Sequence, residues 1–268
     1  MADFTAKDVQ ALRMASGAGM MDAKRALQEN DGDAEAASRW LREKGLVKSG
    51  DRRDRVNAQG AVAVGRTDGS ASAVEVKCET DYVAKSEQFT AFANELAAAV
   101  AAEGPGAAEG LAVRLDDLRL TLKENIELGR IAHFQAGDTS LIDTYLHTQN
   151  GRGVNAVMVE LTGGSMSQAH DVALHVASMR PRWLSRDDVP PERVADEKAL
   201  IETLTRNEGK PEAAVPKIVE GRIGGWLRDT CLLEQPFVKD SKVSVAQFLG
   251  DARLVRFAQV EIGGSSGG

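Results

Sequence analysis

The sequence predicts an α+β protein, in which an N-terminal module of three helices precedes a core of two related α+β subdomains. Apolar residues recur at helical spacing over about the first 45 residues, and from Ala58 they begin to alternate with a period of two. A strand followed by a helix near residue 75 has a second copy near residue 157. The chain has 268 residues, which leaves room for more than one folded unit at about 150 residues per domain.

Three short helices are predicted within residues 1–45. Thr5 can cap the first helix, and Gly17 and Gly19 end it. The second spans about 21–28, and the third ends at Gly45. The apolar residues at helical spacing include Val9, Leu12, Ala37, Trp40 and Leu41. Residues 46–57 carry four basic and two acidic side chains and little apolar content, which predicts a linker.

The first subdomain is predicted over residues 58–140. Alternating apolar residues at 61–64 and 74–78 flank a turn at 67–70, which is typical of a β-hairpin. Helices are predicted at about 86–102 and 115–125, and a strand follows at 126–134.

The second subdomain is predicted over residues 141–185 and 232–262, with a final strand at 253–262. Residues 186–231, between these two parts, have the pattern of an antiparallel helical hairpin that opens at Pro190-Pro191. We expect its seam to contain Val194, Ile201, Leu204, Ile218 and Trp226. The glycine- and serine-rich residues 263–268 have the composition of a flexible tail.

A weak internal repeat relates the two subdomains. Residues 73–76 align with 156–159 at an offset of 83, whereas the following helices, 88–97 and 168–177, align at an offset of 80. The first copy is therefore three residues longer between strand and helix, and the surplus falls within residues 79–85. A protrusion present in one copy alone is a candidate functional element.

Composition excludes several classes of protein. The formal net charge is −7, so a chain-wide basic surface for nucleic acid is absent, and we expect no direct nucleic-acid partner. No apolar run reaches the roughly 18 residues of a membrane helix, and the start lacks a secretory pattern, so we expect a cytoplasmic protein without a membrane partner. Cys78 and Cys231 are expected to be free, buried thiols.

Catalytic and cofactor motifs are missing from the sequence. It contains no GxxxxGK[ST] motif and no GxSxG elbow, so we expect neither direct nucleotide binding nor an enzyme of these classes. His170 and His175 lie about 140° apart around a helix, which does not suit a metal pair. Residues 162–165 have phosphate-loop topology, but a bare turn with a helix cap explains them, and we favour that interpretation. No cofactor and no metal are expected.

Two motifs remain open on physical grounds. Met20-Met21 is compatible with core filling or with a contact surface, because methionine adapts to both. Thr80-Asp81-Tyr82-Val83 is compatible with a helix cap beside a packed aromatic ring, or with a functional loop.

These motifs also carry a family resemblance. Ala11-Leu12-Arg13 with Gly-Ala-Gly-Met-Met-Asp-Ala-Lys-Arg-Ala-Leu at 17–27, and Cys-Glu-Thr-Asp-Tyr-Val-Ala-Lys at 78–85, resemble the two signatures of the bacterial translation elongation factor Ts family. His-Val-Ala at 175–177, Glu-Gly-Arg at 220–222 and Gln-Pro-Phe-Val at 235–238 extend the likeness over most of the chain.

The resemblance implies a guanine-nucleotide exchange factor for elongation factor Tu, with a ubiquitin-associated-like N-terminal module. It implies that Thr80, Asp81, Tyr82 and Val83 enter the partner's GTPase domain near its magnesium site. Leu12, Met20 and Met21 would pack on another helix of that domain, and His175 is a further expected partner-binding residue.

The chain departs from the family pattern at a few positions. Tyr82 stands where phenylalanine is usual, Ser16 where threonine is usual, and Gly129-Arg130 where two arginines are common. The competing hypothesis is an adaptor that binds a protein through its three-helix module and leaves nucleotide exchange unchanged.

Overall fold

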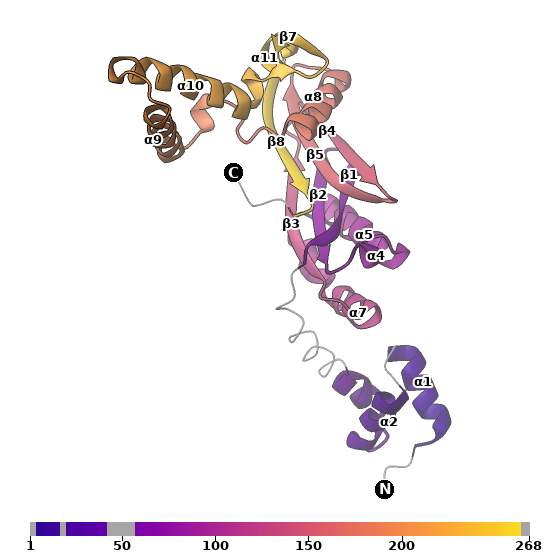
Figure 1. Ribbon diagram of the computed structural model, residues 1–268. Coiled ribbons are helices and arrows are strands. Elements are labelled where there is room, and N and C mark those ends of the chain that lie inside the picture. The colour runs from indigo at the N-terminus through magenta and orange to yellow at the C-terminus, as the bar shows by residue number, and fades with distance from the viewer. Residues whose placement is uncertain (1–3, 17–19, 42–56, 264–268) are drawn as a thin grey trace.

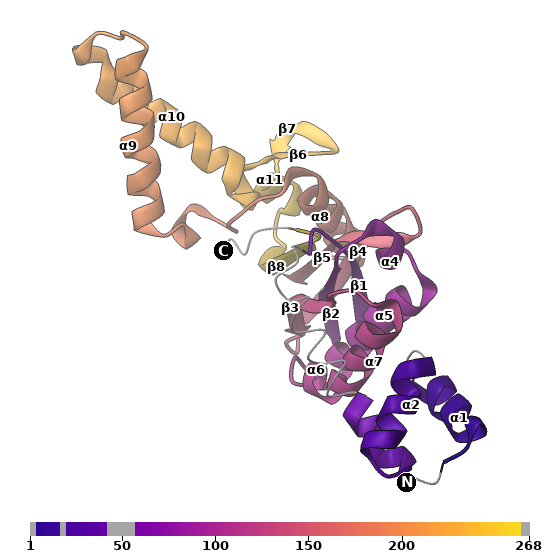
Figure 2. The same cartoon turned by 60° about the horizontal axis from the view of Figure 1, so that its bottom comes forward.

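Two antiparallel sheets of three strands pack face to face, and each carries a helix on its outer side (Figures 1 and 2). The structure is a computed structural model that describes residues 4–16, 20–41 and 57–263. The first sheet has the order β1-β2-β3, from Gln59–Thr67, Ser70–Cys78 and Glu127–Gln135. The second has the order β4-β5-β8, from Ser140–Gln149, Arg152–Thr162 and Arg253–Glu261. The predicted α+β class is confirmed.

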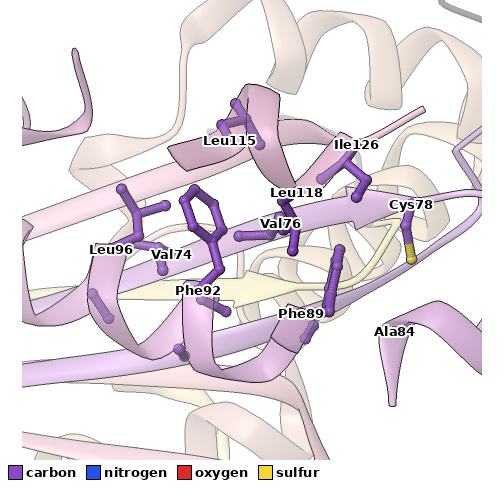
Figure 3. Close-up of a cluster of buried hydrophobic side chains, with 14 of the residues drawn as sticks. Val74, Val76, Cys78, Ala84, Phe89, Phe92, Leu96, Leu115, Leu118 and Ile126 are labelled. Atoms are coloured by element: carbon purple, nitrogen blue, oxygen red, sulfur yellow. The ribbon is translucent and has the colours of Figure 1, made fainter. Parts of the chain in front are cut away.

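The outer face of the first sheet is covered by α5 (Glu87–Glu103), with α6 (Ala107–Gly110) and α7 (Ala112–Leu122) beside it. Ser86 caps α5 by accepting a hydrogen bond from the backbone of Phe89. Side chains from α5, α7 and the central strand β2 meet in one buried cluster (Figure 3). The helix predicted at about 115–125 has the expected length but lies three residues earlier: it ends at Leu122, because Lys123 adopts a left-handed conformation with φ 59°.

Small residues let α5 lie very close to the first sheet. A Cβ added at Gly65 would stand 2.1 Å from the carbonyl oxygen of Ala97. The hydroxyl groups of Ser70 and Ser72 donate to the carbonyl oxygens of Ala101 and Ala97, at 2.7 and 2.6 Å. This close contact therefore depends both on the alanines of α5 and on the small residues of β1 and β2.

The inner faces of the two sheets are also lined by small and medium side chains. Ala71 and Ala73 of β2 face Ala156 and Met158 of β5 in a shared buried cluster. Because one face of β2 meets α5 and the other meets the second sheet, this strand is buried almost along its whole length.

Four arginines fasten the two sheets to each other through main-chain carbonyl oxygens. The bonds run from Arg66 to Ile142, from Arg130 to Gln259, from Arg152 to Gly60 and from Arg256 to Gln135, with the arginine as donor in each. Each of these bonds joins residues of different sheets, and each satisfies a carbonyl group with a charged donor.

The outer face of the second sheet is covered by α8 (Met166–Met179). Ser165 and Gln168 form a capping box at its start, which accounts for residues 162–165 as a helix cap. After the hairpin, β6 (Pro236–Phe237), β7 (Asp240–Ser244) and the unexpected short helix α11 (Val245–Leu249) lead into β8. Single-turn helices occur at Arg186–Asp188, Glu212–Ala214 and Leu232–Glu234.

The predicted hairpin consists of α9 (Pro191–Asn207) and α10 (Val215–Thr230) and projects away from the sheets in both views (Figures 1 and 2). Its seam contains Ile201, Val215 and Val219. The assignment of Leu204 to the seam was wrong, because this side chain is 49% exposed. Thr205 occupies the inward position instead, since it lies four residues after Ile201, and its hydroxyl accepts a hydrogen bond from Arg222.

The N-terminal residues form helices α1 (Ala6–Ser16) and α2 (Met20–Glu29), and residues 34–41 are also helical. Val9, Leu12 and Leu27 share a buried cluster with Ala37 and Leu41. The hydroxyl of Thr5 accepts from the backbone of Asp8, as its capping role predicts. The predicted breaks at Gly17 and Gly19 and most of the 46–57 linker lie outside the described residues.

No helix in the described ranges is long and apolar enough to cross a membrane. Cys78 and Cys231 are both free and buried, as predicted.

The hairpin seam gives a matched pair of substitutions. We expect Ile201→Ala to lower the free energy of unfolding of the hairpin by about 2 to 5 kcal/mol, because it leaves a cavity. Leu204→Ala should change it by less than about 0.5 kcal/mol, because the side chain is exposed. Urea unfolding followed by tryptophan fluorescence measures both. Equal losses of unfolding free energy in the two variants would show that Leu204 does pack in the seam.

Candidate functional site

A short helix, α4 (Asp81–Ala84), occupies the connection between β2 and α5. The corresponding connection between β5 and α8 has no such helix. Thr80 is the N-cap of α4, and its hydroxyl accepts a hydrogen bond from the backbone of Val83 at 3.3 Å. The surplus residues of the first repeat therefore fold as one capped helical turn, and we call residues 79–86 the α4 loop.

Tyr82 extends from this turn into solvent and is 83% exposed. Of the two alternatives left open for this motif, the helix cap is present, but the aromatic ring beside it is not packed. Val83 and Ala84 are buried, and Figure 3 shows Ala84 beside Cys78 and Phe89 at one end of the buried cluster. One side of the turn is thus fixed to the core while the other presents an aromatic side chain.

Asp81 is the second exposed side chain of the turn and pairs with Lys85 at 2.5 Å. This hydrogen bond to Lys85, with the lysine's charge, holds the pKa of Asp81 below its ordinary value. The carboxylate therefore stays ionised throughout the neutral pH range. The α4 loop therefore presents an ionised carboxylate next to an exposed aromatic ring.

Glu124 is not part of the α4 loop but stabilises it through hydrogen bonds. The sequence analysis did not identify this residue. Its carboxylate accepts hydrogen bonds from the backbone nitrogens of Glu79 and Thr80 and from the hydroxyl of Thr80. Glu124 lies 45 positions from Glu79. The sequence did predict the end of a helix near residue 125, but this pattern did not specify any contact of Glu124.

Cys78 lies directly beneath the loop, and its thiol donates to the carbonyl oxygen of Thr80 at 3.2 Å. Burial, together with the nearby charge of Glu124, raises the pKa of Cys78 to about 12. The thiol is therefore neutral near pH 7 and unsuited to act as a nucleophile. Its contribution here is packing and one weak hydrogen bond.

The N-terminal candidates divide into core and surface. Leu12 is 5% exposed and packs within the helical module, whereas Met20 and Met21 are 47% and 73% exposed. Core filling is therefore not the role of these two methionines. They form an exposed apolar pair at the start of α2.

His175 lies on α8 and is fully buried. Its Nδ1 accepts from the backbone of Val238 at 3.1 Å, and its Nε2 lies 2.9 Å from the side-chain oxygen of Gln235. Burial lowers the pKa of His175, so the ring is neutral at pH 7. The histidine anchors residues 235–238 and has no exposed surface of its own.

Among the described residues, no group of three or more histidine, cysteine, aspartate or glutamate side chains is arranged to hold a metal ion.

Comparison with known proteins gives a consistent result. A family model described as Elongation factor TS matches residues 79–264. The chain is 44% identical over 277 residues to elongation factor Ts of Acidothermus cellulolyticus, covering 98% of this chain and 99% of that protein. It is 42% identical to the proteins of the same name from Renibacterium salmoninarum and Mycobacterium ulcerans, with 98% of this chain covered and 100% and 99% of theirs.

Substitutions on the two sides of the α4 turn should differ in their effect on stability. Tyr82→Ala should change the free energy of unfolding by less than about 0.5 kcal/mol, because the ring is exposed. Val83→Ala should lower it by roughly 1.5 kcal/mol, at about 0.8 kcal/mol for each of two buried carbon groups. Urea denaturation monitored by circular dichroism tests both, and a Tyr82→Ala protein that unfolds would identify the ring as a structural plug.

Proposed function

The chain belongs to the elongation factor Ts family, and from this premise we propose that it is the guanine-nucleotide exchange factor of elongation factor Tu. It binds the GDP-bound GTPase and accelerates GDP release during translation elongation. The observation that carries the proposal is the capped α4 turn, which presents Tyr82 and Asp81 to solvent on a buried base.

The mechanism does not require contact with the nucleotide. A GTPase holds GDP mainly through Mg²⁺ and a phosphate-binding loop. An exchange factor therefore has to stabilise a conformation of the GTPase in which those contacts are broken. By linkage, the protein then weakens GDP binding by the same factor as GDP weakens the binding of the protein.

Tyr82 and Asp81 have separate roles in this proposal. The exposed ring of Tyr82 inserts apolar area between elements of the partner, and the charge of Asp81 competes for the groups around the partner's magnesium ion. Thr80 and Val83 hold the turn rather than contact the partner, since the first caps it and the second is buried. Acceleration by 10³ to 10⁵ requires a barrier lower by roughly 4 to 7 kcal/mol.

The N-terminal module provides the second contact. Met20 and Met21 are exposed and adaptable, which suits docking on a helix of the GTPase domain. Leu12 supports this surface from within the module. We propose that His175 acts indirectly, by holding residues 235–238 at the surface of the second sheet.

Substoichiometric protein should accelerate the release of a fluorescent GDP from elongation factor Tu, because each molecule acts repeatedly. Stopped-flow fluorescence with and without the protein measures this. If saturating protein binds the GTPase and leaves the GDP off-rate unchanged, the adaptor hypothesis is correct and the exchange function is not.

Substitutions at the exposed turn should affect exchange in a defined order. Tyr82→Phe should leave it within a few-fold, because a single hydroxyl hydrogen bond contributes only about 0.5 to 1.5 kcal/mol. Tyr82→Ala should cost about 3 to 5 kcal/mol of barrier lowering, by analogy with the truncation of a buried aromatic ring. Asp81→Ala should reduce the maximal release rate more than the affinity.

Leu200→Ala is the matched control for Tyr82→Ala, because it removes an exposed apolar side chain, 54% accessible, from the distant helix α9. It should exchange as the unmodified protein does. Unimpaired exchange by Tyr82→Ala would exclude the proposed role of the ring.

A further inference from the structure

We propose that Glu124 is a positioning residue for nucleotide exchange: it fixes the α4 loop in the conformation that presents Tyr82 before the partner binds. This inference rests on the proposed function. Its structural basis is a contact between residues 79–80, at the end of β2, and residues 123–125, directly after α7.

The contact is reciprocal. Glu124 Oε2 accepts from the backbone nitrogens of Glu79 at 3.0 Å and Thr80 at 3.2 Å. Glu79 Oε1 in turn accepts from the backbone nitrogen of Asn125 at 2.7 Å. Each segment thus supplies a carboxylate to the backbone of the other, and bonds of this charge-assisted kind are stronger than neutral ones.

Thr80 transmits this contact to α4. Its hydroxyl donates to Glu124 Oε1 and accepts from the backbone of Val83, so the orientation set by Glu124 is the one that caps the helix. Its carbonyl oxygen receives the Cys78 thiol and the backbone nitrogen of Ala84. The polar groups of Thr80 are therefore used inside the chain, and its role is support.

The backbone before Glu124 is built for this contact. Lys123 adopts a left-handed conformation, with φ 59°, which is uncommon for a residue other than glycine. It ends α7 and turns the following residues toward the α4 loop. A left-handed residue commonly ends a helix, as Arg180 does after α8, and here this ending places Glu124 next to the α4 loop.

The consequence for exchange is preorganisation. A loop that is already ordered loses less conformational entropy on binding. More of the binding free energy then remains to stabilise a changed conformation of the partner. Without Glu124 the turn keeps its buried residues Val83 and Ala84 but loses the bonds that orient its cap. We therefore expect a folded protein with a mobile Tyr82.

The experiment compares Glu124→Ala, Glu124→Gln, Thr80→Val and the Thr80→Val/Glu124→Gln double variant in the full-length protein. Glu95→Gln is the control, because Glu95 is an exposed carboxylate on α5 that pairs with Arg114 away from the loop. Amide hydrogen exchange over residues 79–86 is measured in the free protein. Catalysed GDP release is measured with elongation factor Tu.

In Glu124→Ala we expect amide exchange over 79–86 to become at least tenfold faster, while the amides of the α5 interior are unchanged. Catalysed release should fall about tenfold. Glu124→Gln should be intermediate, because glutamine keeps one acceptor oxygen. The double variant should lose less than the sum of the losses of its two parents, since both substitutions remove the bond between the Thr80 hydroxyl and Glu124.

Unchanged amide exchange over 79–86 in Glu124→Ala would overturn the proposal, as would a loosened loop with undiminished GDP release. If the unmodified protein fails to accelerate release, the proposed function fails, and the positioning role in exchange fails with it. The amide-exchange result then reports on a structural contact alone. The two failures are therefore distinguishable.

Discussion

The close approach of two small-residue sheet faces is the constraint on which the rest of this structure depends. Alanine and serine on β2 allow a helix on one side and a second sheet on the other, so the strand is buried on both faces. Dense packing of this kind tolerates little movement. The four arginine-to-carbonyl bonds add directional contacts at the margins of the same interface. The outer helices α5 and α8 pack on the two sheets that meet here.

The candidate site gains its rigidity from this arrangement. The α4 loop begins where the central strand β2 ends, so its first residue is held by the most buried strand of the first sheet. Val83 and Ala84 of the loop pack into the same core cluster as Cys78 at the end of β2. A partner that presses on Tyr82 therefore acts against the packed sheets rather than against a flexible connection.

Residue patterns predicted most of the helices and strands, because their periodicity is local. The extra residues in one copy of the repeat also pointed correctly to a distinct connection between β2 and α5. Periodicity alone did not predict which of two neighbouring side chains faces inward. Leu204 and Thr205 are adjacent in the chain, and only packing against α10 decides which of them is buried. Glu124 was missed for the same reason, since its contacts join segments that are 45 positions apart.

The position of β8 in the chain has a consequence for biosynthesis. The first sheet is complete once residue 135 has been made, but β5 pairs with β8 across the whole inserted hairpin, as Val157 opposite Gln259 illustrates. During synthesis one edge of β5 stays unpaired until β8 has been made. The hairpin, whose contacts are local, can form before that. The same final strand supplies the carbonyl oxygen that Arg130 binds. This late strand therefore both covers the unpaired edge of β5 and joins the two sheets.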